Sequence, residues 1–124
     1  TLWLSGTGPS RGRGLFVATR AGDVFGAPTL LTELDSANND RTPVVSEDGL
    51  EIFFARNGAG AGDDILTATR ASTADPFGLP SIPTELRSGG AEWPEALSAD
   101  SCRLYFVSNR AGRWDAYLAT RTRP

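Results

Sequence analysis

The sequence predicts an all-β fold built from small sheets that repeat about every 50 residues. The tripeptide Ala-Thr-Arg occurs at residues 18–20, 68–70 and 119–121, at spacings of 50 and 51 residues. Apolar runs are short, rich in β-branched and aromatic residues, and bounded by Gly, Pro, Asn and Asp, which is typical of strands. No window shows the 3.6-residue period of a helix. Several motifs in register at one long period indicate a repeat architecture, in which each unit buries its apolar face against its neighbour.

The repeat unit contains four expected strands. The first two are joined by a tight turn at Glu47-Asp48-Gly49, where Asp bonds its own backbone and Gly accepts a positive φ. The third strand ends in the Ala-Thr-Arg tripeptide, and the fourth follows the Phe-Gly-x-Pro motif at residues 25–28 and 77–80. Ten strands are expected in all, near residues 2–5, 15–19, 28–33, 43–46, 51–55, 64–69, 82–86, 95–98, 103–108 and 115–120.

Four short antiparallel strands in 40–50 residues describe one blade of a β-propeller. We therefore expect residues 1–124 to form a partial β-propeller: a partial blade at 1–42, a full blade at 43–93 and a partial blade at 94–124. Ten strands give about two and a half blades, whereas propellers close with 4–8. The chain is then part of a larger propeller, or one of several copies in a ring, or is completed by another subunit. A homo-oligomer that closes the ring is the favoured arrangement.

The repeats resemble a known family. Pro-x-x-Ser-x-Asp-Gly, a strand ending in Phe-x-Ser-x-Arg, a Gly-containing loop and Asp-x-Tyr resemble the WD-like repeat of TolB-like β-propellers. In the last copy the matching residues are Ser98, Asp100, Phe106, Ser108, Arg110, Gly112, Asp115 and Tyr117. The middle copy keeps Ser46, Asp48, Gly49, Phe54 and Asp64, but departs from the pattern at residues 55–57 and at Leu66. The resemblance implies a bacterial protein of the periplasm or cell exterior, found in envelope complexes or attached to peptidases.

Composition excludes several function classes. The chain has no His, so it holds no Ser-His-Asp or Cys-His centre of its own. Its net charge of −3 argues against nucleic-acid binding, and it has no apolar run long enough for membrane insertion. Cys102 is the single cysteine and is expected to be a structural thiol. No cofactor is expected, and the chain is predicted not to be an enzyme.

Residues that recur in every copy are expected to be structural. Asp48 and Asp100 stand at the same turn, and Arg20, Arg70 and Arg121 end the same strand. A unique site would not repeat, so turn stabilisation and packing of the arginine stems are favoured over a sialidase-like carboxylate clamp.

The acidic group Asp63, Asp64 and Asp115 has two interpretations. Clustered carboxylates beside a Gly-rich loop suit Ca²⁺, although the spacing is not that of an EF-hand. Alternatively, Asp64 and Asp115 orient the neighbouring loops through backbone N–H groups. No metal is assigned.

Residues that vary between copies are the better candidates for binding. Two loop classes share one face of a propeller, and loops on a rigid scaffold commonly carry function. Arg and Trp are also enriched at interaction hot spots. The predicted ligand-binding residues are Asp40, Arg41, Arg56, Asn57, Glu92, Trp93, Asn109, Arg110 and Trp114. The competing interpretation is that the two tryptophans fill space between blades.

Three functions follow from these observations. The first is a non-catalytic module that binds a protein, peptide or glycan on one face of a propeller. The second is the propeller part of a larger hydrolase, of peptidase or glycosidase type, with catalysis elsewhere. The third is a purely structural repeat that serves assembly. Fold alone does not choose among them.

Overall fold

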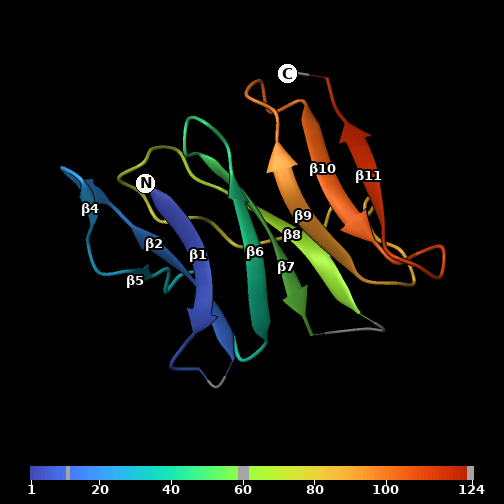
Figure 1. Cartoon of the computed structure of the whole chain (residues 1–124), viewed down its shortest axis with the longest axis horizontal. Coiled ribbons are helices and arrows are strands. Elements are labelled where there is room, and N and C mark those ends of the chain that lie inside the picture. Colours follow the sequence, from blue (N-terminus) through green and yellow to red (C-terminus); the bar gives the residue numbers. More distant parts are fainter. Residues whose placement is uncertain (11, 59–61, 123–124) are drawn as a thin grey trace.

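The computed structural model describes residues 1–10, 12–58 and 62–122, and over these residues it contains strands and turns but no helix (Figure 1). The all-β prediction is confirmed. The strands are β1 (Leu2–Thr7), β2 (Arg13–Ala18), β3 (Arg20–Ala21), β4 (Val24–Phe25), β5 (Thr29–Leu30), β6 (Asn39–Val45), β7 (Glu51–Asn57), β8 (Asp63–Thr69), β9 (Glu92–Leu97), β10 (Arg103–Ser108) and β11 (Asp115–Thr120).

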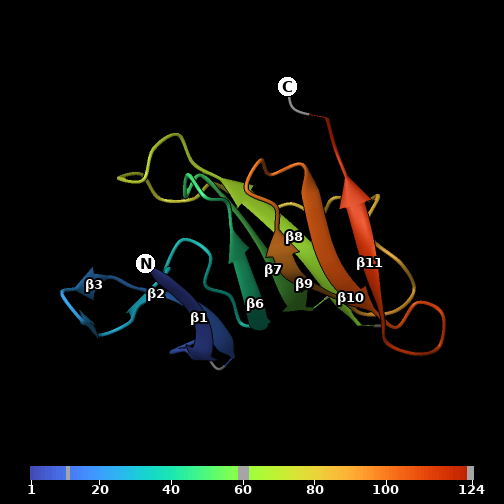
Figure 2. The same ribbon diagram turned by 45° about the horizontal axis from the view of Figure 1, so that its top comes forward.

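Three antiparallel sheets carry the fold, each with three strands. We call them the first sheet (β1-β2-β5), the middle sheet (β6-β7-β8) and the last sheet (β9-β10-β11). A fourth sheet is the small β3-β4 hairpin. The three larger sheets lie side by side in chain order, and β6 contacts β1 on one side and β9 on the other (Figures 1 and 2). The middle sheet is therefore enclosed by its two neighbours.

The first core lies between the first and middle sheets. Successive side chains of a strand point to opposite faces, so Ile52 and Phe54 of β7 share the face that meets the first sheet. Both are fully buried, together with Leu15 and Leu34 of the first sheet and its following loop. Phe77, from the connection after β8, closes this core and is 3% exposed.

The second core lies between the middle and last sheets and uses the opposite face of β7. Phe53 and Ile65 meet Leu104 and Phe106 of the last sheet. Phe106 stacks on Tyr117, its partner across β10 and β11, at a ring distance of 5.6 Å. Strand β7 is apolar on both faces because both are covered.

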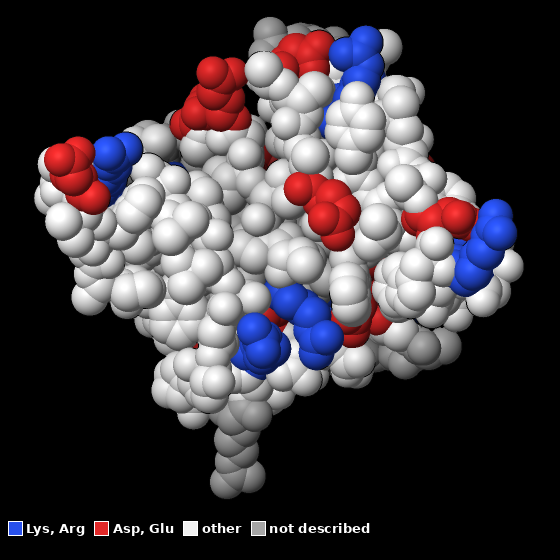
Figure 3. Space-filling view, viewed as in Figure 1, with Lys and Arg blue, Asp and Glu red and all other residues white. Residues whose placement is uncertain are grey.

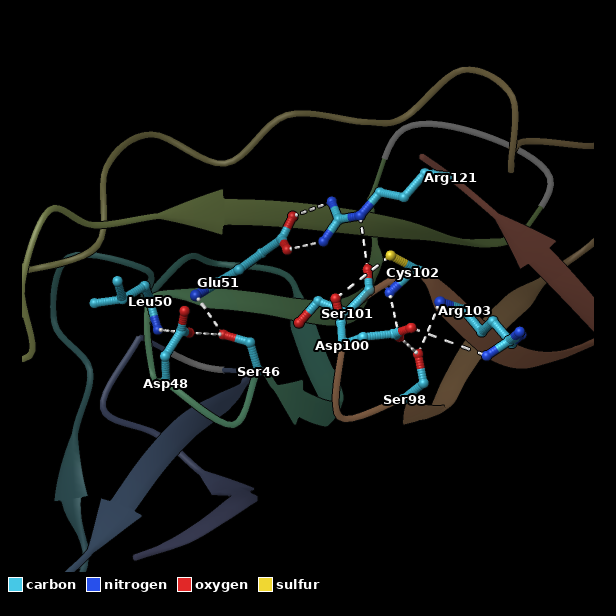
Figure 4. A network of polar contacts seen from close by, with 10 residues as sticks. All are labelled: Ser46, Asp48, Leu50, Glu51, Ser98, Asp100, Ser101, Cys102, Arg103 and Arg121. Atoms are coloured by element: carbon cyan, nitrogen blue, oxygen red, sulfur yellow. Dashed lines mark hydrogen bonds and ion pairs between the residues drawn. The ribbon is translucent and has the colours of Figure 1, made fainter. Parts of the chain in front are cut away.

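The same turn joins the first two strands of the middle and last sheets (Figure 4). The Ser46 hydroxyl donates to Asp48 Oδ1 at 2.7 Å, and Ser98 donates to Asp100 Oδ1 at 2.6 Å. Each serine oxygen also accepts the backbone N–H five residues on, at 2.9 Å in both copies. The expected role of Asp48 and Asp100 in the turn matches these bonds.

The expected fourth strands are mostly absent. Only Thr29–Leu30 of the range 28–33 forms a strand, and only Ser81, just before the range 82–86, makes a bridge, to Thr67. Pro28, Pro80 and Pro83 lack the N–H that a ladder needs, which explains why pairing stops there. The chain then turns, so that Leu34 and Leu86 point into the two cores.

Strands β3 and β4 were not predicted. They form a hairpin with two residues in each strand, which begins at Arg20, the last residue of the first Ala-Thr-Arg tripeptide. Gly22 occupies the turn with a φ of 65°, a conformation that glycine adopts without strain. Strands β6 and β9 also begin several residues before the expected positions, at Asn39 and Glu92.

Candidate binding surface

The predicted binding residues lie at one end of the middle and last sheets, which we call the ion-pair end. In the middle sheet β6 begins there and β7 ends there, so that Asp40 lies opposite Arg56. In the last sheet Glu92 lies opposite Ser108, two residues before Arg110. The antiparallel register thus brings segments about 16 residues apart in sequence to the same place.

Asp40 and Arg56 form a buried ion pair. Arg56 donates from Nε to Asp40 Oδ1 at 2.6 Å and from Nη2 to Oδ2 at 3.1 Å. The same guanidinium reaches the Leu34 carbonyl at 2.7 Å and lies over the Phe54 ring. Asp40 is fully buried. This pair ties the loop before β6 to the end of β7, so these two predicted ligand groups face inward instead of toward solvent.

Glu92 and Arg110 repeat this arrangement more loosely in the last sheet. Arg110 Nη2 lies 3.6 Å from Glu92 Oε1 and donates to the Leu86 carbonyl at 2.8 Å. Glu92 is fully buried, and its Oε1 accepts hydrogen bonds from the hydroxyls of Ser88 and Ser108. The Glu92 carboxylate is therefore held mainly by neutral donors. Its Oε2 is buried without a hydrogen-bond partner.

The two predicted asparagines differ in their surroundings. Asn109 Oδ1 accepts the Ala91 N–H at 2.7 Å and so fixes the entry to β9. Asn57 ends β7 opposite Asp63 and is exposed. Six of the nine predicted residues thus belong to strand ends or internal pairs, and the remaining three are Arg41, Trp93 and Trp114.

These three residues come together with Asp63 in a surface group that we call the tryptophan cluster (Arg41, Asp63, Trp93, Trp114). The two tryptophan rings are 4.9 Å apart with an interplanar angle of 39°. Trp93 Nε1 donates to Asp63 Oδ2 at 2.7 Å. The Arg41 guanidinium lies 6.0 Å from the Trp93 ring centre. The cluster spans two sheets, because Arg41 and Asp63 belong to the middle sheet and Trp93 to the last.

The tryptophan cluster has the chemistry of a recognition surface. Trp114 is 47% exposed, so one ring of the pair is open to solvent. Arg41 Nε is 3.9 Å from Asp63 Oδ2, too far for a hydrogen bond. An aromatic face, a cation and a carboxylate lie together there, and such groups can stack on a flat ligand surface and fix its polar edge.

Irregular backbone places Arg41 in the cluster. The pairing of β6 with β7 shifts between Arg41 and Val44, and Thr42 within this bulge has a φ of 50°. A bulge adds a residue to one strand and redirects the neighbouring side chains. Asp63 was predicted only as a possible calcium ligand, although its place after the Gly-rich loop at residues 58–62 marks it as a strand start.

The acidic residues considered for calcium are each paired with an arginine. Asp64 lies 3.3 Å from Arg87, and Asp115 lies 3.0 Å from Arg113. Among residues 1–10, 12–58 and 62–122, no three acidic, His or Cys side chains are grouped so that they could hold a metal ion. Charged side chains on the face seen in Figure 3 form separated groups, and several of these groups contain both acidic and basic residues.

The opposite end of the sheets, which we call the turn end, joins the middle and last sheets by a second polar contact. Arg121 makes two hydrogen bonds to the Glu51 carboxylate and one to the Ser101 carbonyl (Figure 4). The hydrogen bonding of the Arg121 guanidinium to the Glu51 carboxylate raises the pKa of Arg121 above its ordinary value. A cleft of about 410 Å³ opens beside this pair and is lined in part by Phe53, Thr67 and Cys102. None of the predicted binding residues lines it.

Comparisons with known proteins give no relative for this chain: no family model matches it, and neither does any curated protein. Over its described part, the structure has no helix with the length and apolar character needed to cross a membrane.

Proposed function

We propose that the chain is a non-catalytic binding module whose three sheets are consecutive blades of a TolB-like β-propeller, and that the tryptophan cluster is its ligand site. The ligand is a peptide, a protein segment or a glycan. The partner contact would form at the ion-pair end, around Trp114.

The single observation that carries this proposal is the half-exposed Trp114 ring beside Trp93, Asp63 and Arg41. Exposure of a large aromatic ring is costly unless something covers it, and aromatic side chains with Arg are enriched where proteins bind. The other charged residues at this end serve the fold through buried pairs. The tryptophan cluster is therefore the best candidate for a contact with a ligand.

Tryptophan fluorescence tests the proposal directly. The chain has 3 tryptophans, so a Trp3→Phe background leaves only Trp93 and Trp114 as reporters. In that background, arrays of peptides and glycans would supply hits, and each hit would be titrated by fluorescence and calorimetry. We expect Trp114→Ala to weaken binding at least about tenfold, since hot-spot truncation costs roughly 2 kcal/mol or more.

Leu79→Ser is the matched control, because Leu79 is an exposed apolar residue that belongs to neither core. It should leave the affinity unchanged. Binding that survives Trp114→Ala, or that Leu79→Ser removes equally, would place the ligand elsewhere and overturn the proposed site.

A role in assembly is the second candidate, and one observation favours it. Exposed apolar side chains lie at both ends of the row of sheets: Leu2 of β1 with Val24 and Phe25 of the β3-β4 hairpin at one end, and Tyr105 and Leu118 of the last sheet at the other. Such faces are covered in a closed ring of blades. Assembly and ligand binding use different surfaces, so one does not exclude the other.

A further inference from the structure

The two junctions between sheets share one contact, made by the arginine that directly follows the third strand of the middle and of the last sheet. Arg70 of the middle unit lies 5.9 Å from the Trp3 ring of the first sheet. Arg121 of the last unit lies 6.0 Å from the Phe53 ring of the middle sheet. Trp3 and Phe53 hold the same register position, one residue after the partner of Ala18 or Ala68. An arginine of one unit therefore packs on an aromatic ring of the unit before it.

Phe77 adds a second part to the contact at the first junction. Its ring meets the Trp3 ring edge-on at 6.2 Å and lies 4.4 Å from the Arg70 guanidinium. At this junction the donor half thus consists of an arginine and a phenylalanine. The acceptor half is an aromatic ring on the second strand of the neighbouring sheet.

Both halves of this contact also occur without a partner, at opposite ends of the molecule. Arg20 and Phe25 occupy the sequence positions of Arg70 and Phe77, but they lie opposite each other in the β3-β4 hairpin, beside the first sheet. Phe25 is 46% exposed, against 3% for Phe77. On the last sheet Tyr105 holds the position of Trp3 and Phe53, and its cross-strand neighbour Leu118 is likewise exposed.

We propose, building on the blade interpretation above, that a second copy of this chain covers the open face. The first sheet of one copy would pack on the last sheet of the other, with Arg20 and Phe25 against Tyr105. The contact is heterologous, because it joins two different surfaces of the chain. Two copies with three units each give six units, which lies within the range of closed propellers.

The charges at the proposed contact differ from those at the second junction. Asp23 is fully exposed next to Arg20, and Arg103 is exposed next to Tyr105. Arg103 occupies the position of Glu51, the residue that binds Arg121 at the second junction. In the proposed contact Arg20 would therefore face Arg103, and Asp23, which is fully exposed next to Arg20, would compensate the two positive charges.

Sedimentation velocity and light scattering on the full chain test the proposal. We expect a mass twice that of the 13.1 kDa chain at high concentration. Two variants disrupt one surface each: Arg20→Ser with Phe25→Ser, and Tyr105→Ser with Leu118→Ser. Each should be a folded monomer, because the substituted side chains are exposed. Leu79→Ser is the control and should keep the wild-type mass.

Mixing the two disrupted variants gives the decisive result. A ring of two copies has two equivalent contacts, and in a mixed pair one contact combines both intact surfaces. We therefore expect the mixture to form a dimer that neither variant forms alone. A monomeric wild type at all concentrations, or a dimer that neither variant weakens, would overturn the second-copy proposal. Ligand binding at the tryptophan cluster is read by fluorescence in the same samples, so the two proposals fail separately.

Discussion

The middle and last sheets carry apolar side chains at the same register positions, but only the middle sheet has both faces covered. Phe53 and Tyr105 occupy equivalent places, and their exposed fractions are 6% and 46%. Strand β8 is buried along most of its length, whereas in β11 exposed and half-buried residues alternate strictly. A half-buried strand shows this alternation, and a strand enclosed on both faces does not.

This difference in burial arises from the apolar side chains of the neighbouring sheet and not from the sequences of the strands themselves. Leu97, Leu104 and Phe106 of the last sheet cover Phe53 and Ile65. Nothing in the described chain does the same for Tyr105. Burial at equivalent register positions therefore depends on which sheet lies next to the strand.

The largest effect is expected when the equivalent aromatic residues Phe53 and Tyr105 are replaced by alanine. Phe53→Ala should cost about 3–4 kcal/mol of unfolding free energy, because it removes a buried ring from the second core. Tyr105→Ala should cost about 0.5 kcal/mol or less in the monomer, as for most exposed positions. Urea unfolding followed by circular dichroism measures both.

Equal losses for the two variants would contradict the comparison. A loss at Tyr105 that grows with protein concentration would instead point to a covered face in an oligomer.

The second test compares the two buried carboxylates. Asp40→Asn should cost about 3 kcal/mol, since Arg56 would keep its charge in a mostly buried place without its counter-ion. Glu92→Gln should lower the unfolding free energy by about 1 kcal/mol. The Glu92 carboxylate accepts hydrogen bonds mainly from serine hydroxyls, and the amide oxygen of glutamine can accept the same bonds.

Asp23→Asn is the control for these two variants, since the Arg20–Asp23 pair is exposed, and it should leave the unfolding free energy of the monomer unchanged. If Glu92→Gln lowered the unfolding free energy as much as Asp40→Asn, the ion pair between Glu92 and Arg110 would contribute more to stability than its 3.6 Å separation indicates.

Sequence patterns were sufficient for the fold class and for eight of the ten expected strand positions near their observed places. The runs at β7 and β10 are rich in aromatic and aliphatic residues, so their pairing needs little outside information. The expected strands 28–33 and 82–86 failed because prolines interrupt the ladder. The β3-β4 hairpin was missed because its strands have only two residues each.

The candidate site was harder to predict because residue type does not reveal burial. Asp40 and Arg56 have the chemistry of ligand groups, and only the strand register shows that they face each other inside the fold. Asp63 joined the site through a hydrogen bond from Trp93, a residue 30 positions away. Such contacts depend on how one sheet is placed against the next, which local patterns do not encode.

The third test concerns the turn that both sheets share. Gly49 and Ser101 hold equivalent positions with φ values of 75° and 59°. Gly49→Ala should cost about 1–2 kcal/mol, because a side chain is strained at positive φ. Ser101→Gly should raise the unfolding free energy by about 0.5 kcal/mol. It removes the backbone strain of a serine at positive φ, and this gain exceeds the entropy that glycine adds to the unfolded chain. Thermal unfolding of both variants measures this, and a stable Gly49→Ala would show that the turn tolerates a side chain.

The smallest effect is expected at the Arg121–Glu51 pair, which the junction between the first and middle sheets lacks. Arg70, its counterpart, has backbone carbonyls of Gly49, Thr73 and Asp75 as its polar partners. Nearly half of the Arg121 side chain is exposed, so a double-mutant cycle of Arg121→Gln and Glu51→Gln should give a coupling of only about 0.5 kcal/mol, lowered further by salt.

The pH dependence of this coupling follows from the raised pKa of Arg121. A group whose pKa is raised by folding contributes its full stabilisation below its unfolded pKa and loses it only as the pH rises through the folded value. The coupling should therefore stay constant from neutral to mildly alkaline pH. A coupling that disappeared within that range would contradict the raised pKa, because Arg121 would then lose its charge below its ordinary pKa.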